Sequence, residues 1–511
     1  MIFKFRYSYA YSIIFIIGCY VLLPVMNYEY LFALQENSLW VKGHTFMEEI
    51  VNERGGWLAY IACYLTQYLY HPWLGTTILI ILWLIIFCLI TYRSGIPDKC
   101  TFLMLIPIAY LPVMVLSLGY WIYYSKCPGF AFLPTLQVLV VALIIRIIYI
   151  LFIKVKNTTV RLIRSLFLSL VFFIAVIAIG HSYSKFDQFF ITVNNDNFRK
   201  ELTMYHALDE CRWQDILDIS PKVNDKDNGH PTNFMALCKD IALMSTGQLA
   251  EQMFMYDNCC VLPQTGDSLK VHLTKQAGPM LYYHFGFINY AYRWSIENGV
   301  KYYYSFDSLK MLVRCAIFNQ EFEVAMKYIT ILKSTTFYRK WALEHEAMIY
   351  DNRLFINSEE YQCISPLITQ DNELAVDNAN IEYFILDYFS NLNSSKNKIE
   401  ELALNASLLL QQEEEFMIHF YNYTLNHQGE AVPQIYQQAA YMLGPTDLSP
   451  IDVSQYPFDV NVTSTSDAFT NDYRTLLGQG KSEEQIASAL KPNYGSTYWW
   501  YYYFYHKHNY Y

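Results

Sequence analysis

The chain has 511 residues and a formal net charge of −10, and this charge is unevenly distributed. Residues 1–180 contain 12 Lys and Arg against 6 Asp and Glu, whereas the remainder contains 24 against 40. The acidic remainder argues against nucleic-acid binding, because neutralising phosphates requires clustered basic side chains. Its high content of aromatic and aliphatic residues excludes a disordered tail. We therefore expect two regions with different surroundings.

Five apolar runs in the first region are each close to the length that crosses a bilayer as a helix. These runs are Tyr7–Met26, Leu74–Tyr92, Thr101–Leu118, Phe130–Phe152 and Ser165–Tyr183. Pro107 and Pro112 predict a kinked or locally unwound helix in the third run. The first run is a loose match to a lipoprotein cleavage site before Cys19. Because the run continues past this residue, an uncleaved anchor helix is favoured.

The segment Trp57–Tyr70 is shorter and lies between a pair of glycines and a proline. These features favour an interfacial or re-entrant helix, with a short sixth span as the alternative. It ends the loop at residues 27–73, which connects the first two predicted spans.

Basic residues predict the orientation of the spans. Two short loops are rich in them, with Arg93, Lys99, Lys154, Lys156, Arg161 and Arg164. Such loops remain cytoplasmic. The sequence thus predicts a multi-pass protein of the bacterial inner membrane. Its transmembrane domain occupies residues 1–183, and a soluble periplasmic domain occupies residues 184–511.

The second region has the periodicity of α-helices, so the expected fold class is all-α. Apolar residues from Leu309 to Ala316 recur at helical spacing, and Phe322–Leu332 repeats the pattern after a short turn. This predicts an antiparallel helix pair that approaches closely at Ala316 and Ala325. Similar pairs at intervals of roughly 30–45 residues predict an irregular solenoid, with a plain helical bundle as the alternative.

Two further features appear near the end of the chain. The Pro-, Asp- and Ser-bearing segment Gly444–Thr465 predicts a loop or extended segment. The aromatic segment Tyr498–Tyr505 predicts a capping helix that buries its rings. A contact of these rings with lipid headgroups is the alternative.

Candidate site residues are few, and no motif for a metal, nucleotide or other cofactor is present. Glu29 and Glu36 lie in the acidic loop after the first span, where a carboxylate could act as general base toward a lipid-linked donor. The loop resembles that of polyprenyl-phosphate-sugar glycosyltransferases at Tyr28–Tyr30, Gln35–Asn37 and Gly55–Trp57. The alternative is that these acids are exposed to solvent on amphipathic helices of the loop. Arg146, inside a predicted span, either binds a lipid phosphate or extends to the headgroups.

The order of these parts resembles an uncharacterised family of bacterial multi-pass membrane proteins with a C-terminal tetratricopeptide-like repeat region. The resemblance is carried by Gln35–Asn37, Gly55–Tyr68, Pro72–Gly75, Gly286, Asn289, Ala291 and Tyr338–Ala342. It implies an all-α fold and no particular activity. We expect the periplasmic domain to bind a protein partner in an envelope assembly. The alternative is an integral-membrane glycosyl or related group transferase, and a transporter is less favoured.

Overall fold

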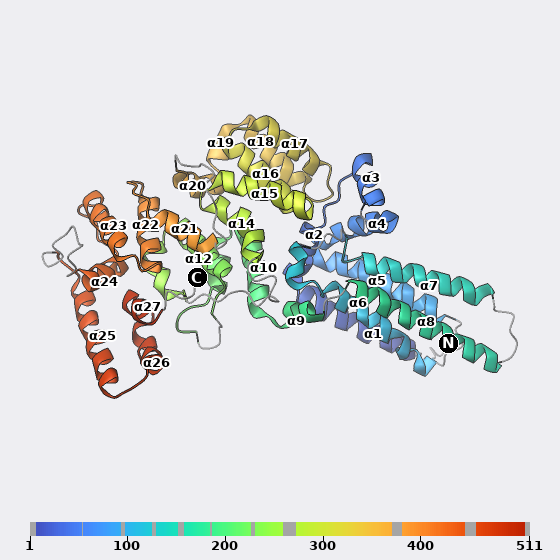
Figure 1. The fold of residues 1–511 in the computed structure, drawn as a ribbon. Helices are drawn as coiled ribbons and strands as arrows, with labels where there is room; N and C mark the ends of the chain where they lie inside the picture. Colours follow the sequence, from blue (N-terminus) through green and yellow to red (C-terminus); the bar gives the residue numbers. More distant parts are fainter. Residues whose placement is uncertain are drawn as a thin grey trace, which may run out of the picture. The chain divides into compact units, whose positions relative to one another are not determined.

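The computed structural model describes residues 7–53, 55–92, 98–124, 129–151, 158–183, 186–225, 230–258, 272–369, 381–444 and 456–505. Within these residues every regular element is helical (Figure 1), apart from one isolated antiparallel bridge between Lys222 and Tyr256. The predicted all-α class is therefore confirmed. The chain forms two compact units, one of residues 1–202 with 295–350 and one of residues 203–294 with 351–511. The boundary predicted at residue 183 separates a transmembrane domain from a soluble periplasmic domain, and it stays a prediction.

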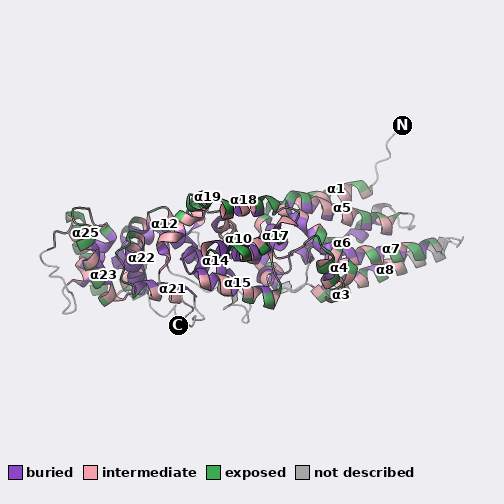
Figure 2. Ribbon diagram, turned by 90° about the horizontal axis from the view of Figure 1, so that it is seen from above, coloured by how far each residue is buried: buried purple, intermediate pink, exposed green. Residues whose placement is uncertain are grey.

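Among the described residues of the first unit, four helices are long and apolar enough to cross a membrane. They are α1 with its π-helical end η1 (Tyr7–Tyr20 and Val21–Val25), α5 (Pro72–Thr91), α7 (Leu133–Leu151) and α8 (Thr158–Tyr183). Helix α5 contacts both α1 and α7, and α7 contacts α8. The outer sides of these helices expose apolar side chains (Figure 2), among them Ile14, Ile85, Ile147 and Phe167. This pattern is that of a multi-pass membrane protein, since hydrocarbon is the medium that covers such faces.

The third predicted span, Thr101–Leu118, is a shorter helix than expected. Helix α6 covers Phe102–Val115, and its 14 residues extend about 21 Å at 1.5 Å per residue. It holds Pro107 and Pro112 without interruption, and the chain then turns into the short 3₁₀ helix η4 (Gly119–Tyr123). The segment before α5 is also short, with α4 at Gly56–Thr66 and the 3₁₀ helix η2 at Gln67–Tyr70. Neither is long enough to be among the four candidate spans.

Helix α1 continues through Cys19, which is buried, to Val25. The π-helical turn at its end contains Pro24, whose missing amide hydrogen disturbs regular α-helical bonding.

The orientation predicted for the spans depends on six basic residues in two loops. Arg93, Lys154 and Lys156 lie outside the described residues, as do the side chains of Lys99, Arg161 and Arg164.

The helix pair predicted around residue 320 is confirmed. Helix α16 (Phe306–Phe318) packs against α17 (Phe322–Lys333), which in turn packs against α18 (Arg339–Tyr350). Ala316 and Ala325 are both fully buried, because small side chains let the two helices approach. Upstream of them, α14 (His272–His284) meets α15 (Ile288–Tyr302) through the ring of Tyr282, whose centroid is 5.2 Å from that of Tyr290.

Six connections between described helices share one turn geometry. In each, the second residue after the helix has a positive φ, and the next amide donates to the carbonyl five residues earlier. This pattern is the Schellman motif, which satisfies carbonyls left unpaired at a helix end. The positive-φ residues are Cys211, Gly247, Gly286, Gln320, Gln411 and Gly480. The first four are spaced 34 to 39 residues apart, which is the spacing predicted for the helix pairs.

Helices α21 (Ile381–Ser390), α22 (Asn397–Leu409), α23 (Glu413–Asn426) and α24 (Gln434–Leu443) pack in sequence. Beyond them lie α25 (Val460–Gly478), α26 (Glu483–Tyr494) and α27 (Tyr498–Phe504). The loop predicted to reach Thr465 ends earlier, because the side chain of Asp459 accepts from the amide of Asn461 and caps α25. The helix predicted for the aromatic segment is confirmed, and its rings are buried in part, since Tyr498 and Trp499 are buried and Trp499 packs in a core with Phe469.

Candidate functional site

Helix α2 (Tyr28–Glu36) follows the first candidate span directly and is buried over most of its length. Its last two residues, Gln35 and Glu36, are polar yet almost inaccessible to solvent. The amide of Gln35 donates to Oε1 of Gln67 at 3.2 Å, and Gln67 donates to the backbone carbonyl of Ser38 at 2.6 Å. These bonds hold α2 and the residues after it against η2.

A lysine from a distant part of the chain completes this buried cluster. Nζ of Lys310, on α16, lies 3.1 Å from Oε1 of Glu36 and 3.0 Å from Oδ1 of Asp307. The hydroxyl of Tyr338 donates to Oε1 of Gln35 at 2.9 Å. Burial, together with the nearby Glu36 carboxylate, raises the pKa of Tyr338 well above its ordinary value. Its hydroxyl therefore keeps its proton and remains a hydrogen-bond donor.

We call this buried cluster of Gln35, Glu36, Asp307, Lys310 and Tyr338 the joint, because it connects α2 to the helices around α16. Burying charges is costly unless each is paired and hydrogen-bonded, and here one ammonium serves two carboxylates. The loss of one partner would leave an uncompensated charge in the interior. Glu36 would have to leave Lys310 before it could act as a general base.

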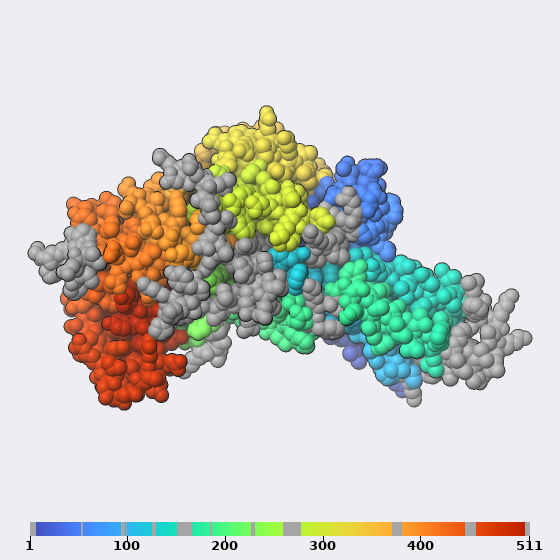
Figure 3. Space-filling view, viewed as in Figure 1, coloured from blue at the N-terminus to red at the C-terminus, as the bar shows by residue number. Residues whose placement is uncertain are grey.

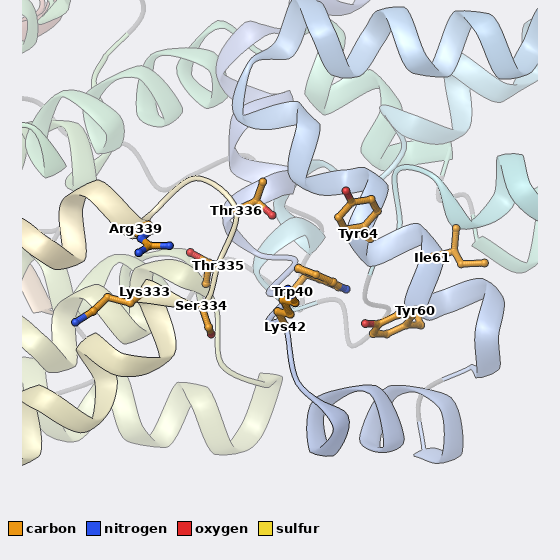
Figure 4. Close-up of a pocket in the computed structure, with 10 residues that line it drawn as sticks. All are labelled: Trp40, Lys42, Tyr60, Ile61, Tyr64, Lys333, Ser334, Thr335, Thr336 and Arg339. Atoms are coloured by element: carbon orange, nitrogen blue, oxygen red, sulfur yellow. The ribbon is translucent and has the colours of Figure 1, made fainter.

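A pocket of about 670 Å³ lies beside the joint, between α4 and the turn that connects α17 to α18 (Figure 4). One wall is aromatic and apolar, with Trp40, Tyr60, Ile61 and Tyr64. The ring centroid of Trp40 lies 4.9 Å from that of Tyr64 and 6.1 Å from that of Tyr60. The opposite wall is polar, with Lys333, Ser334, Thr335, Thr336 and Arg339, and Lys42 also lines the pocket.

The polar wall contains two cationic side chains, Lys333 and Arg339, and three hydroxyl groups. Nζ of Lys333 lies 2.8 Å from Oε2 of Glu346, so this charge is shared with a carboxylate that does not line the pocket. The hydroxyls of Ser334 and Thr335 donate to the last carbonyls of α17 at 2.6 Å. Their oxygen atoms keep the ability to accept a hydrogen bond.

A family model described as a family of unknown function, DUF6057, matches residues 4–180 and 167–505. The chain belongs to this family. No curated protein and no solved structure matches the chain.

In this DUF6057 protein the predicted site residues lie near opposite ends of α5. Glu29 and Glu36 are on α2, which contacts η2 and the adjoining α5. Arg146 is on α7, where Nη1 donates to the backbone carbonyl of Tyr92 at 2.6 Å, at the opposite end of α5. Twenty helical residues separate these ends, which is about 30 Å. The glutamates and the arginine are therefore not brought together.

Arg146 has a local role in this arrangement. Its guanidinium carbon lies 5.2 Å from the ring centroid of Tyr92 and 5.5 Å from that of Tyr149. A charged donor at the last carbonyl of a helix satisfies a group that the helix leaves unpaired. Arg146 thus caps the end of α5 while lying over two aromatic rings.

Sequence reasoning missed Lys310, Asp307, Tyr338 and the pocket residues. One signal was available, because Lys310 is the one polar residue within the apolar run Leu309–Val313 of the predicted helix. A lysine within a buried helix requires an ionic partner. The identity of that partner, 274 positions away, is a property of the tertiary fold.

Proposed function

We propose that this DUF6057 protein is a bacterial inner-membrane scaffold whose helical-repeat region faces the periplasm and binds a protein partner in an envelope assembly. The observation that carries the proposal is the recurrence of one helix-turn-helix geometry at intervals of 34 to 39 residues. Tetratricopeptide-like repeats have this spacing, and stacked pairs of this kind form extended surfaces that bind proteins. The proposed orientation rests on the basic loops of the sequence.

Helix α23 offers a specific docking surface in the second unit. Glu414, Ile418, Tyr421 and Leu425 are its exposed residues at helical spacing. Three of them are large and apolar, with Ile418 44% exposed and Leu425 47% exposed. Figure 3 shows the surface that α22 and α23 contribute in orange. We call this row of four residues the α23 stripe. An exposed apolar row of this kind fits an amphipathic helix from another protein.

Charge restricts the choice of partner. Residues 381–505 contain 15 Asp and Glu against 5 Lys and Arg, and Glu413–Glu415 begin α23. An acidic surface attracts a basic partner and repels an acidic one. The proposed occupant is therefore a basic amphipathic helix, with its apolar side on the α23 stripe.

Site-specific photocrosslinking in living cells tests this function. A photoreactive amino acid is placed in the full chain at Ile418, Tyr421 or Leu425, and at Leu477 as a control. Leu477 is also apolar and exposed, but it lies on α25. We expect the same discrete protein adduct from all three stripe positions and none from the control.

A second variant makes the result specific to the surface. The double change Ile418→Ser and Leu425→Ser alters exposed side chains, so the fold should remain intact. It should remove the adduct formed at Tyr421. An adduct pattern that is the same at Leu477, or that survives the double change, would contradict the proposal.

A further inference from the structure

We infer that the pocket between α4 and the α17–α18 turn binds a phosphate group carried by an amphiphile, such as the headgroup of a membrane lipid. This site is separate from the α23 stripe and does not depend on the scaffold function. Three features of the pocket support this inference, namely its charge, its apolar wall and its place beside the candidate spans.

The charge of the pocket selects an anion. Lys42, Lys333 and Arg339 line it, and none of the described residues in its lining is Asp or Glu. Arg339 and Lys42 are exposed and can move toward a ligand, whereas Lys333 is held near Glu346. A guanidinium presents two parallel N–H donors to phosphate oxygens, and an ammonium adds a point charge. The hydroxyl of Thr336 provides a further polar contact on the same wall.

The opposite wall selects a ligand with an apolar part. Trp40, Tyr60, Ile61 and Tyr64 line it, and Figure 4 shows Trp40 and Tyr64 between the polar wall and the more distant Ile61. Nε1 of Trp40 is buried without an acceptor among the described residues, so the wall also contains an unused donor. A free phosphate ion would use the cations alone. The volume of 670 Å³ lies in the range of small-molecule sites, which is larger than a phosphate ion needs.

The position of α4 links the pocket to the membrane. Helix α4 packs against α7, one of the candidate spans, and the amide of Gly129, just before α7, donates to Oγ of Ser38 at 2.9 Å. Trp57 and Ile61 of α4 are 59% and 44% exposed. Exposed Trp beside the end of a span is typical of the membrane–water boundary. An amphiphile could therefore place its chains along α4 and its phosphate between Lys42 and Arg339.

Binding measurements on the intact protein in a neutral detergent test the inference. The probes are short-chain phosphatidic acid, diacylglycerol without phosphate, and water-soluble glycerol 3-phosphate. The test variant combines Lys42→Gln with Arg339→Gln. The control combines Lys327→Gln with Lys340→Gln, which removes the same charge from exposed lysines outside the pocket.

We expect phosphatidic acid to bind the wild type and the control equally. The test variant should bind it at least about tenfold more weakly, because it lacks two cations that make charge-assisted hydrogen bonds to the phosphate. Glycerol 3-phosphate should bind far more weakly than phosphatidic acid. If glycerol 3-phosphate and phosphatidic acid bind equally, the apolar wall does not contribute to binding, and an amphiphile is excluded as the ligand. Equal binding of diacylglycerol, or equal loss in both variants, would overturn the phosphate site.

Discussion

Nζ of Lys310 lies 3.1 Å from Oε1 of Glu36, although 274 positions separate the two residues in the chain. This contact joins the helix that follows the first candidate span to a helix pair from the polar region. The first unit therefore contains the four candidate spans together with some of the repeat-like helices. The pocket beside α4 exists because this joint holds the two parts together.

Replacement of Lys310 by Met should lower the free energy of unfolding by about 3–5 kcal/mol, because the buried Glu36 and the partly exposed Asp307 would lose their cation. Thermal unfolding of the purified protein in detergent measures the change. The double variant Lys310→Met with Glu36→Gln should recover part of the loss. Lys333→Met breaks a partly exposed pair with Glu346, so it should cost about 1 kcal/mol or less. Equal costs for the two lysines would argue against the joint.

Two glycines at the same turn position should differ in their tolerance of alanine. Gly247 and Gly286 both have a positive φ, so alanine at either position strains the backbone by about 1–2 kcal/mol. A Cβ at Gly247 would meet nothing within 4 Å, whereas one at Gly286 would lie 2.9 Å from the carbonyl of Leu367. Gly286→Ala should therefore lower the unfolding temperature more than Gly247→Ala. The reverse order would contradict the turn geometry.

The stability of the second unit should depend on pH through His230. Nδ1 of His230 lies 2.8 Å from Oδ2 of Asp257, and this hydrogen bond raises the pKa of His230 above its ordinary value of 6.5, against the opposing charge of Lys491. A histidine whose pKa is higher in the folded protein stabilises the fold fully when the pH is below its pKa in the unfolded chain. This stabilisation is lost as the pH rises through its pKa in the folded protein.

The unfolding temperatures of the wild type and His230→Asn should therefore differ more at low pH than at high pH. Measuring both proteins from about pH 5.5 to pH 8.5 tests this, and the comparison cancels other titrating groups. The effect should be small, since half of the His230 side chain is exposed. A difference that grows with pH would reverse the expected sign.

Arg146 should act mainly on stability. Arg146→Met removes the donor to the Tyr92 carbonyl, so it should lower the unfolding temperature by less than Lys310→Met does, because Arg146 is only partly buried. Phosphatidic acid binding should be unchanged, since the pocket lies near the other end of α5. If Arg146→Met abolished this binding, the lipid phosphate would have to be assigned to Arg146.

Local patterns predicted local structure well. The spacing of apolar residues placed the helix pair α16–α17 and its buried alanines, because a helix with one apolar face has few ways to bury it. Hydropathy alone overestimated the length of α6, since it does not record where the chain turns into η4. The pairing of Lys310 with Glu36 depends on the tertiary fold. The carboxylate of Glu36 is buried, contrary to the expectation of solvated acids in this loop.

The orientation of the helical region is the premise of the scaffold proposal, and a dual reporter tests it most directly. Alkaline phosphatase, active only outside the cytoplasm, and green fluorescent protein, fluorescent only inside it, are each fused behind Tyr511 of the full chain. The account predicts phosphatase activity without fluorescence. Fluorescence without phosphatase activity would place the acidic helices in the cytoplasm and contradict the proposed function.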